Sequence, residues 1–383
     1  MAEATMSLIP VTVLTGFLGS GKTTLLNHLL GQPGLADTAV LINEFGAVGL
    51  DHLLVRPVSE TMVLLQSGCL CCTVRGDLVE GMRELFLKRV KGEVPEFNRV
   101  VIETTGLADP APILHTLMND PLISSRYKLD GICTVVDAVN GATTLNAQPE
   151  AVKQVAVADR VLLTKTDIAA PAALAALRER LAALNPAARP VEAPFGRVDP
   201  AAILDAGLFK AGEKVPDVAR WLNEEAITDA ERRRHARDHD HGHDHHHGHG
   251  HDHGHGHGHG HGHGHGHGHG HDPNRHDARI QAFVFTTAEP VSWPALAFAL
   301  EMMISAKGEN LLRVKGIVNV AGEAAPLAIH GVQHVFHPPC PLPGWPDDDR
   351  RTRIVFITRD LGPETVRGLL EGVIALDATA EPS

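Results

Sequence analysis

The sequence lacks the two features that would place it in a membrane or on nucleic acid. No apolar run approaches the roughly 18 residues that a transmembrane helix needs. No block of Lys and Arg could follow a phosphate backbone, and the formal net charge is -12, from 34 basic and 46 acidic residues. These absences predict that the protein acts neither in a membrane nor on nucleic acid.

Cysteine is also scarce, and a secretory signal is not expected. The opening "MAEATMSLIPVTVLTGFLG" has no basic residues before its apolar part and no small-residue cleavage site after it, so we expect a cytoplasmic protein. Three of the five cysteines lie within four positions, which does not fit a disulfide framework. In such a chain they are better explained as thiols kept for metal or redox chemistry.

Short apolar runs rich in Val, Ile and Leu alternate with helical patterns through the first two hundred residues. Their continuous hydrophobicity is typical of strands buried on both faces, with helices covering a parallel sheet. Residues 1–223 are therefore expected to form a doubly wound α/β domain with a parallel sheet. The expected strands are Val11–Gly16, Ala39–Asn43, Val100–Glu103, Gly131–Ala138 and Arg160–Asp167.

The composition changes at Glu224, first to charged residues and then to His-Gly repeats, neither of which can bury apolar surface. Residues 224–278 are therefore expected to be a disordered His-rich linker. Residues 279–383 return to strand and helix patterns, which predict a smaller α+β domain. Its expected strands are Arg279–Thr287, Leu311–Val320, Leu327–His337 and Thr352–Thr358, and its expected helices are Trp293–Ala306 and Pro363–Leu376.

The stretch "GFLGSGKTT" matches the Gly-x-x-x-x-Gly-Lys-Thr phosphate loop and lies between a strand and a helical pattern. Its glycines let backbone N–H groups turn toward phosphates, helped by the positive end of the helix dipole. Lys22 would hold the β- and γ-phosphates, and the Thr23 hydroxyl would hold Mg²⁺. A chance glycine-rich turn is the alternative. The residues expected to bind nucleotide here are Gly16, Gly19, Ser20, Gly21, Lys22, Thr23 and Thr24.

An acidic residue follows at the end of the strand in "RVVIETTG". Glu103 there is expected to lie near Mg²⁺ or the attacking water, and Gly106 to offer its N–H to the γ-phosphate, because strand ends are where ligands bind in such sheets. A role for Glu103 as a helix cap is the alternative. The candidate catalytic residues are Lys22, Thr23 and Glu103.

The tetrapeptide "TKTD", again at a strand end, resembles the Asn-Lys-x-Asp guanine motif. A carboxylate accepts hydrogen bonds from the guanine N1–H and exocyclic amine, which adenine does not offer, so Asp167 would select GTP. Thr164 and Lys165 are also expected at the nucleotide. The first position is Thr rather than Asn, which puts one contact in doubt, and an ordinary turn is the alternative.

The cysteines of "SGCLCC" precede a helical pattern that includes Arg75. The helix dipole and this arginine would lower the thiol pKa values, and thiolates bind metal. Cys69, Cys71 and Cys72 could supply three ligands to Zn²⁺ and leave a fourth position open, which suits transfer. A redox pair or inert core cysteines are the alternatives. Cys133 is expected in the core and Cys340 in a loop.

Histidine is concentrated in one segment, since 20 of the 26 histidines lie between His235 and His276. Neutral imidazoles with glycine spacers, beginning with His239, His241 and His243, are expected to gather Zn²⁺, Co²⁺ or Ni²⁺. A purification tag or a solvated linker is the alternative.

A second, smaller group of histidines lies in "IHGVQHVFH" near the end of the chain. On a single strand, His330 and His334 would lie on one face and His337 on the other. They are therefore expected to be surface residues without a joint metal site.

The order of "TGFLGSGKTTLLNHLL", "INEFG", "GCLCC", "ETTGLADP", "LDGICTVVDAV" and "LLTKTD" resembles that of CobW-family P-loop GTPases. The late "LLRVKGIVNVAGE" and "GVQHVF" resemble the C-terminal domain of that family. The resemblance is strongest to its zinc-transfer branch, where "TKTD" also occurs. It implies a switch segment at "NEFG", so Glu44 could reach Mg²⁺ or the metal site, with a plain capping or turn role as the alternative.

The resemblance implies a GTP-dependent metallochaperone that holds Zn²⁺ at the Cys-x-Cys-Cys motif and transfers it to metal-requiring client proteins. One alternative is a His-rich metal store in which nucleotide is only structural. Another is the same GTPase with cobalt as cargo, acting in cobalamin synthesis, although thiolates favour zinc. The oligomeric state and the client stay open.

Overall fold

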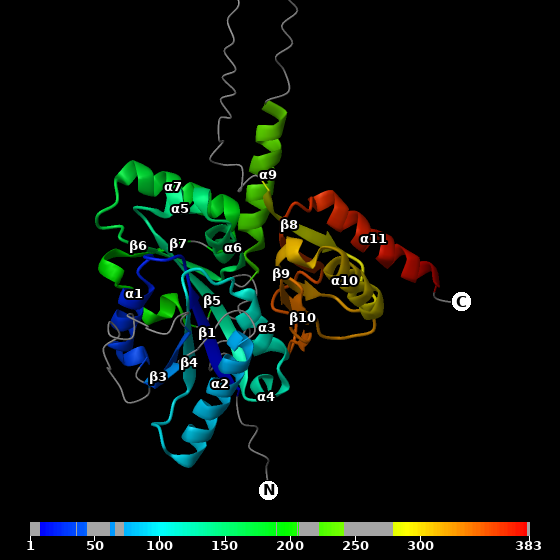
Figure 1. Ribbon diagram of the computed structural model, residues 1–383. Helices are drawn as coiled ribbons and strands as arrows, with labels where there is room; N and C mark the ends of the chain where they lie inside the picture. Colours follow the sequence, from blue (N-terminus) through cyan, green and yellow to red (C-terminus); the bar gives the residue numbers. More distant parts are fainter. Residues whose placement is uncertain are drawn as a thin grey trace, which may run out of the picture.

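The structure is a computed structural model of the chain. A seven-stranded parallel sheet occupies its first part and a six-stranded antiparallel sheet its last part, with helices around both (Figure 1). The predicted fold class is therefore confirmed. The described residues are 8–35, 37–43, 62–65, 73–188, 190–204, 206, 222–240 and 279–380.

The first sheet has the strand order β3-β2-β4-β1-β5-β6-β7, and all neighbouring strands are parallel. Each of the five expected strands is present, and the sheet has two more, β3 and β7. The carboxyl ends of these strands share one edge, where the expected nucleotide residues lie. The strands are β1 (Ile9–Thr15), β2 (Thr38–Asn43), β3 (Met62–Leu65), β4 (Arg99–Thr104), β5 (Tyr127–Asp137), β6 (Arg160–Thr164) and β7 (Pro190–Ala193).

Helices cover both faces of this sheet, as continuous hydrophobicity of the strands requires. Along β1, Val13 packs in a cluster with α2 and α3, whereas Leu14 packs in a second cluster with α1. Within the described part of the chain, no helix has the length and hydropathy to cross a bilayer. The helical elements are α1 (Lys22–Leu30), η1 (Pro33–Leu35), α2 (Thr73–Lys91), α3 (Ala111–Asn119), α4 (Pro121–Ser124), α5 (Gly141–Ala147), α6 (Pro149–Val157), α7 (Pro171–Leu184), η3 (Pro194–Gly196) and η4 (Pro200–Ala202).

The second sheet has the order β11-β10-β9-β13-β8, with β12 paired to β10, and its pairs are antiparallel. Helices α10 and α11 cover one face, where Leu300 and Leu370 pack on Phe283 and Phe356. The elements are β8 (Ile280–Thr287), α10 (Trp293–Lys307), η5 (Gly308–Asn310), β9 (Leu311–Val318), β10 (Leu327–Val332), β11 (Val335–Phe336), β12 (Cys340–Pro341), β13 (Thr352–Arg359) and α11 (Pro363–Ala380).

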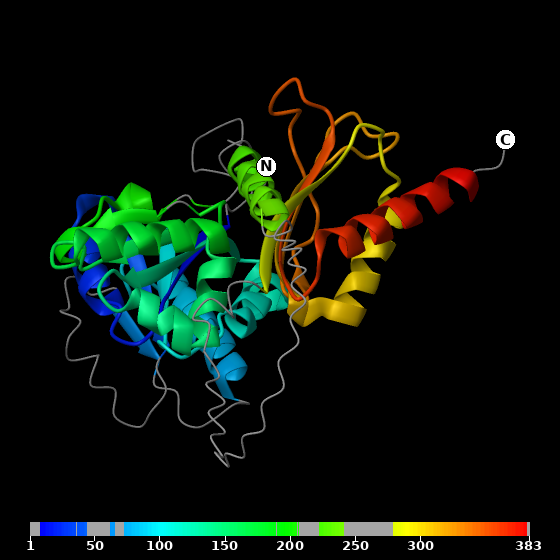
Figure 2. The ribbon, with the colours of Figure 1, turned by 90° about the horizontal axis from the view of Figure 1, so that it is seen from above.

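The opposite face of the second sheet packs toward the first domain. Val284, Leu312 and Val355 belong to the same buried cluster as the α2 and α3 face of the first sheet. Helix α9 (Glu224–Asp240) lies between the two sheets in both views (Figures 1 and 2). The two domains therefore share buried apolar surface.

The prediction that residues 224–278 lack structure is wrong for 224–240, which form α9. Ile227 is fully buried against the shared cluster, and Glu231 pairs with Arg367 of α11 at 2.6 Å. One well-placed apolar residue and one interdomain ion pair hold a segment whose average composition is strongly polar. Residues 241–278 lie outside the described residues.

The expected strand Leu327–His337 is in fact a hairpin. Strand β10 ends at Val332, Gln333 takes a left-handed φ of 53°, and β11 returns antiparallel to β10. His330 and His337 therefore lie opposite each other, with stacked rings whose centroids are 5.7 Å apart. The prediction that they lie on opposite faces of one strand is wrong, because it assumed an uninterrupted strand.

Candidate nucleotide-binding site

The phosphate loop joins β1 to α1, where the sequence predicts it. Gly16 has a φ of 141°, and a Cβ there would lie 2.3 Å from the Val135 carbonyl oxygen, so only glycine lets the loop leave the sheet here. Gly19 and Gly21 also have left-handed φ angles, of 73° and 91°. The loop thus ends at the amino end of α1, where N–H groups have no partner within the helix.

Two side chains of the loop suit a phosphate ligand. Lys22 is 8% exposed, and its Nζ donates to the carbonyl oxygens of Gly16 at 2.8 Å and Phe17 at 3.3 Å. The Ser20 hydroxyl is buried without a hydrogen-bond partner. Phosphate oxygens would give both groups stronger, charge-assisted acceptors. Thr24 is exposed on the first turn of α1, beside Gly196 of η3.

Thr23 and Glu103 come together as the sequence predicts. The Thr23 hydroxyl donates to Glu103 Oε1 at 3.1 Å, although the residues are 80 positions apart, and Glu103 is 6% exposed. Beneath them, the hydroxyl of Thr104 donates to that of Thr15 at 2.9 Å and ties β4 to β1. A hydroxyl and a carboxylate are hard oxygen donors, so the pair fits Mg²⁺ beside a nucleotide phosphate.

Gly106 touches the phosphate loop directly. A Cβ at Gly106 would lie 2.5 Å from Leu18 N and 2.7 Å from Leu18 Cα. Its φ is outside the left-handed region, so glycine is required here by space alone. The backbone after β4 therefore lies against the loop and cannot shift toward it without displacing it.

The segment that follows Gly106 reaches both α6 and the second domain. The Ala108 carbonyl accepts from Gln154 Nε2 at 3.0 Å. Asp109 accepts from Lys153 Nζ at 3.3 Å and from Gln333 Nε2, also at 3.3 Å, and Gln333 is the turn residue between β10 and β11. The chain from Gly106 to Asp109 therefore contacts the phosphate loop at one end and the second domain at the other.

Thr164 and Lys165 of "TKTD" contact the phosphate loop, whereas Asp167 is exposed. Thr164 is 2% exposed, and its hydroxyl donates to Ser20 O at 2.6 Å, so it supports the phosphate loop instead of presenting a hydroxyl to a base. Lys165 Nζ donates to Gly19 O at 2.9 Å. Asp167 is exposed, and its Oδ1 accepts from Phe195 N at 2.9 Å.

Three further residues lie at this edge of the sheet that the sequence reasoning missed. Asp137, at the end of β5, pairs with Lys165 at 2.6 Å and accepts from Asn140 Nδ2 at 2.9 Å. Burial opposes ionisation of Asp137, but hydrogen bonds from Lys165, Asn140 and the Val139 N–H together outweigh it and lower its pKa. Phe195 is 70% exposed with a φ of 54°, beside Asp167. Their position at strand ends was the available signal.

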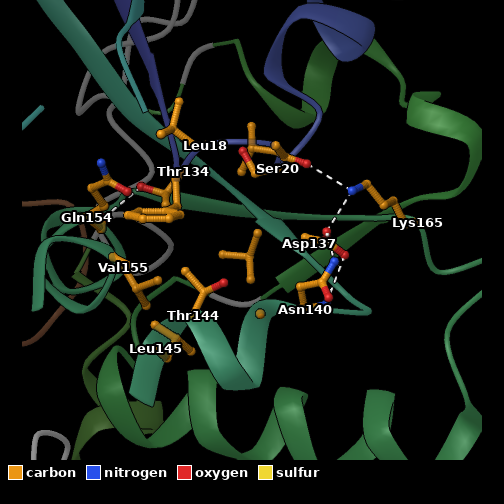
Figure 3. A pocket seen from close by; sticks show the side chains of 16 residues that line it. Leu18, Ser20, Thr134, Asp137, Asn140, Thr144, Leu145, Gln154, Val155 and Lys165 are labelled. Atoms are coloured by element: carbon orange, nitrogen blue, oxygen red, sulfur yellow. Dashed lines mark hydrogen bonds and ion pairs between the residues drawn. The ribbon is translucent and has the colours of Figure 1, made fainter. Parts of the chain in front are cut away.

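A cavity of about 270 Å³ lies beside the loop (Figure 3). Phe17, Leu18 and Ser20 form one wall, and α5 and α6 form another. Lys165 and Asp137, which form an ion pair, are among the residues that line it (Figure 3). Gly19 and Ser20 of the phosphate loop line it, whereas Lys22, Thr23 and Glu103 do not.

Most of the expected metal ligands lie outside the described residues; Thr23, described above, is an exception. The cysteine motif falls between the end of β3 at Leu65 and the start of α2 at Thr73, and Glu44 follows the end of β2. His239 lies in α9, but its side chain is not among those described. In the described part, no three His, Cys, Asp or Glu side chains are grouped as metal ligands. The predicted ligands that are not described are Glu44, Cys69, Cys71, Cys72, His241 and His243.

The remaining cysteines are described. Cys133 is fully buried, as expected, and burial raises its pKa. Cys340 was expected in a loop but lies in the short strand β12, paired with β10.

Comparisons with known proteins agree with this arrangement. Residues 10–192 match the nucleotide-binding domain of the CobW/HypB/UreG family, and residues 280–374 match the C-terminal domain of the cobalamin synthesis protein CobW. The zinc chaperone YjiA of Escherichia coli is 31% identical over 368 residues, which cover 96% of this chain and 99% of that protein. The crystal structure of Zn(II)-bound YjiA GTPase from E. coli matches with a TM-score of 0.64 at 27% identity, over 96% of this chain and 99% of that one.

A eukaryotic relative matches a shorter part. The zinc-regulated GTPase metalloprotein activator 1 of Schizosaccharomyces pombe is 38% identical over 204 residues, which cover 51% of this chain and 48% of that protein.

Proposed function

The chain belongs to the CobW/HypB/UreG family, and from that premise we propose that it is a GTPase that delivers Zn²⁺ to client proteins. The observation that carries the proposal is the segment from Gly106 to Asp109, which links the phosphate loop to the second domain. The names of its relatives, a zinc chaperone and a zinc-regulated GTPase, support zinc as the cargo.

Nucleotide binding follows from the loop. The phosphates would take the backbone N–H groups at the start of α1, and Lys22 would exchange its loop carbonyls for phosphate oxygens. Asp167 would accept from the guanine N1–H and amine, because its carboxylate is exposed and is positioned by the Phe195 N–H. The exposed Phe195 ring would pack against the base.

Hydrolysis gives GDP and phosphate by attack of water on the γ-phosphate. Thr23 and Glu103 would hold Mg²⁺, which neutralises charge on the phosphate oxygens. Glu103 would also orient the attacking water, and Lys22 would stabilise charge that develops between the β- and γ-phosphates. The Gly106 N–H would bind the γ-phosphate and lose that partner when phosphate leaves.

Loss of the γ-phosphate would be coupled to release of the metal through the helices that follow the segment from Gly106 to Asp109. Gly106 to Asp109 leads into α3, and α3 packs against α2, whose first residue follows the cysteine motif by sequence. Loss of the γ-phosphate would therefore shift the start of α3, the neighbouring α2 and the second-domain turn at Gln333 together. Cys69, Cys71 and Cys72 would release Zn²⁺ as α2 moves, and the His run would gather further ions beside them.

The test is zinc transfer to a colorimetric chelator from protein loaded with one equivalent of Zn²⁺, with GTP, GDP or a non-hydrolysable GTP analogue. We expect faster release when GTP is hydrolysed than with the analogue, and no such difference in Lys22→Ala. Lys307→Ala, at the exposed end of α10, is the matched control and should behave like the parent protein. A metal store would release zinc at the same rate under all conditions.

A second comparison tests the ligands. Replacement of Cys69, Cys71 and Cys72 with serine should abolish the tightly bound equivalent of zinc while leaving GTP binding unchanged. Cys133→Ala removes a thiol from the core and should retain that zinc. Equal zinc retention in the triple variant would contradict the assigned ligands, and cobalt retained in preference to zinc would change the cargo.

A further inference from the structure

Asp137, the last residue of β5, is a nearly buried carboxylate that the proposed hydrolysis does not use; it is 8% exposed. The N–H groups of Val139 and Asn140 donate to its Oδ1 at 2.7 and 3.2 Å. Asn140 Nδ2 and Lys165 Nζ donate to its Oδ2 at 2.9 and 2.6 Å (Figure 3). The turn after β5 therefore orients the carboxylate, and its second oxygen receives the lysine.

Lys165 joins this carboxylate to the phosphate loop. Its Nζ donates both to Asp137 Oδ2 and to Gly19 O, the latter at 2.9 Å. The lysine side chain is 37% exposed, so water competes for its ammonium group. Of its two acceptors, only the carboxylate adds the attraction of an opposite charge to the hydrogen bond. Asp137 therefore holds the ammonium group beside the loop.

The backbone of Lys165 is held in an uncommon conformation. Its φ is 58°, in the left-handed region that residues other than glycine rarely adopt. Such a conformation persists where surrounding contacts hold it, and it occurs often at functional sites. The residue before it, Thr164, is fixed by its hydroxyl, which donates to Ser20 O at 2.6 Å. Two successive residues at the end of β6 thus hold two successive carbonyls of the loop, those of Ser20 and Gly19.

The contact at Gly19 fixes a turn within the loop. Gly19 itself is not confined by packing, since a Cβ there would meet nothing within 4 Å. Because the peptide unit is planar, holding the Gly19 carbonyl also holds the N–H of Ser20. That N–H donates to Phe17 O at 3.2 Å and closes the turn from Phe17 to Ser20. Lys165 therefore supplies a restraint that packing does not.

GTP and GDP need the same loop shape, because both would place phosphates on its N–H groups. A change in that shape should alter the binding of both nucleotides by the same factor. The reacting end of GTP is expected at Lys22, Thr23 and Glu103, and none of the Asp137 contacts given above reaches these residues. A loss of affinity without a loss of hydrolysis would thus identify a residue that acts on the loop.

We propose that Asp137 is a positioning residue for nucleotide binding, which holds Lys165 on the Gly19 carbonyl and so keeps the phosphate loop in the shape that both nucleotides bind. The inference rests on the proposed placement of the nucleotide at this loop and is independent of zinc. The alternative is a role confined to the turn after β5, where the carboxylate would only accept from Val139 and Asn140. Asparagine could fill that role, because it keeps an oxygen acceptor.

The test is nucleotide binding by the full-length protein with Mg²⁺ and without added zinc. Dissociation constants for GDP and a non-hydrolysable GTP analogue are measured by calorimetric titration, and hydrolysis of bound GTP is measured in a single turnover. Asp137→Asn keeps the acceptor for the turn and removes the charge that holds Lys165. We expect both affinities to fall about tenfold, as for loss of one hydrogen bond between charged groups at a partly exposed site. The hydrolysis rate of bound GTP should stay within about twofold of the parent rate.

A second variant shows whether Asp137 acts through Lys165. Lys165→Met removes the ammonium group from a partly exposed side chain and should weaken binding of both nucleotides about tenfold or more. The double variant should bind like the weaker of the two single variants, because both remove the same interaction. Asp120→Asn is the matched control. This carboxylate caps α4 by accepting from Leu122 N at 2.9 Å, and the loss of its charge should leave nucleotide binding unchanged.

Four results would overturn the proposal. One is parent-like affinity for both nucleotides in Asp137→Asn, which would confine the carboxylate to the turn. Another is parent-like affinity in Lys165→Met, which counts whether or not Asp137→Asn folds in thermal melting. A third is a loss that multiplies to about 100-fold in the double variant, which would show that the two residues act separately. The last is hydrolysis of bound GTP that falls as far as the affinity does.

Lys22→Ala separates this inference from the proposed function. If Lys22→Ala binds nucleotide like the parent protein, the loop is not the nucleotide site, and the proposed function fails with it. If Lys22→Ala loses nucleotide binding while any of the four results above is found, the positioning role of Asp137 alone is refuted.

Discussion

Replacing Gly106 with alanine places one methyl group between the segment after β4 and the phosphate loop. The new Cβ would lie 2.5 Å from Leu18 N, where ordinary contacts begin at 3.4 Å, so the two backbones must separate by about 0.9 Å. No backbone strain is added, because the φ of Gly106 is one that alanine adopts. A displacement of about 1 Å at a reacting centre costs roughly 100-fold in rate, which is about 2.7 kcal/mol on the barrier.

The assay is single-turnover hydrolysis of GTP, with affinities for GDP and a non-hydrolysable GTP analogue measured separately. We expect the hydrolysis rate of Gly106→Ala to fall about 100-fold. The analogue should lose more affinity than GDP, because the change is on the side proposed to bind the γ-phosphate.

The control is Gly344→Ala, whose added Cβ meets nothing within 4 Å. It should hydrolyse GTP at the parent rate, and thermal melting establishes that both variants are folded. A Gly106→Ala rate within twofold of the parent rate would refute the reasoning, since it would mean that the loop tolerates the displacement or that Gly106 is not at the reacting phosphate.

Other residues give three further predictions. Asp159→Asn should lower the free energy of unfolding in urea by about 3–5 kcal/mol, because it leaves Arg313 and Lys315 buried without their carboxylate, whereas Asp229→Asn, in an exposed ion pair, should cost at most about 1 kcal/mol. Burial opposes ionisation of Asp159, but Arg313 and Lys315 outweigh it and hold its pKa well below the unfolded value of about 3.9. The stabilisation by Asp159 is therefore complete above about pH 4 and is lost as the pH falls. The difference in the free energy of unfolding between the parent protein and Asp159→Asn should then shrink as unfolding is measured at lower pH. A difference that stays constant with pH would show that the ion pairs of Asp159 are not the source of the stabilisation. Deletion of residues 241–276, which spares α9, should lower the number of zinc ions bound and slow loading in scarce zinc while leaving GTP hydrolysis within twofold; loss of GTP binding would show that the His run belongs to the catalytic architecture.

Features encoded over a few neighbouring residues could be predicted from the sequence. The phosphate loop depends on glycines at fixed spacing between a strand and a helix, and those requirements are local. The strands of the first sheet were visible because burial on both faces leaves continuous apolar runs. Glu103 and Gly106 were recognisable because their positions follow from the end of one such strand.

Local patterns failed where a few contacts outweighed the average composition. Helix α9 has a strongly polar sequence, yet Ile227 and the Glu231–Arg367 pair dock it between the domains. The strand predicted to end at His337 is interrupted at Gln333, which has a left-handed φ. A glutamine in the sequence does not predict that conformation. That break brings His330 and His337 together, so the face of each histidine depended on a turn that hydrophobic periodicity could not reveal.

The sequence by itself determined the nucleotide loop, five strands of the parallel sheet and the order of the two domains, because each follows from spacing or periodicity along the chain. Only the tertiary structure decided which distant groups meet. Thr164 supports Ser20 from 144 positions away, Asp109 meets Gln333 across the domain boundary, and Arg313 is buried against Asp159 with two of its nitrogens unsatisfied. Such contacts depend on strand order and on how two sheets pack, and the free energy of a buried charge is set by partners that no local pattern specifies.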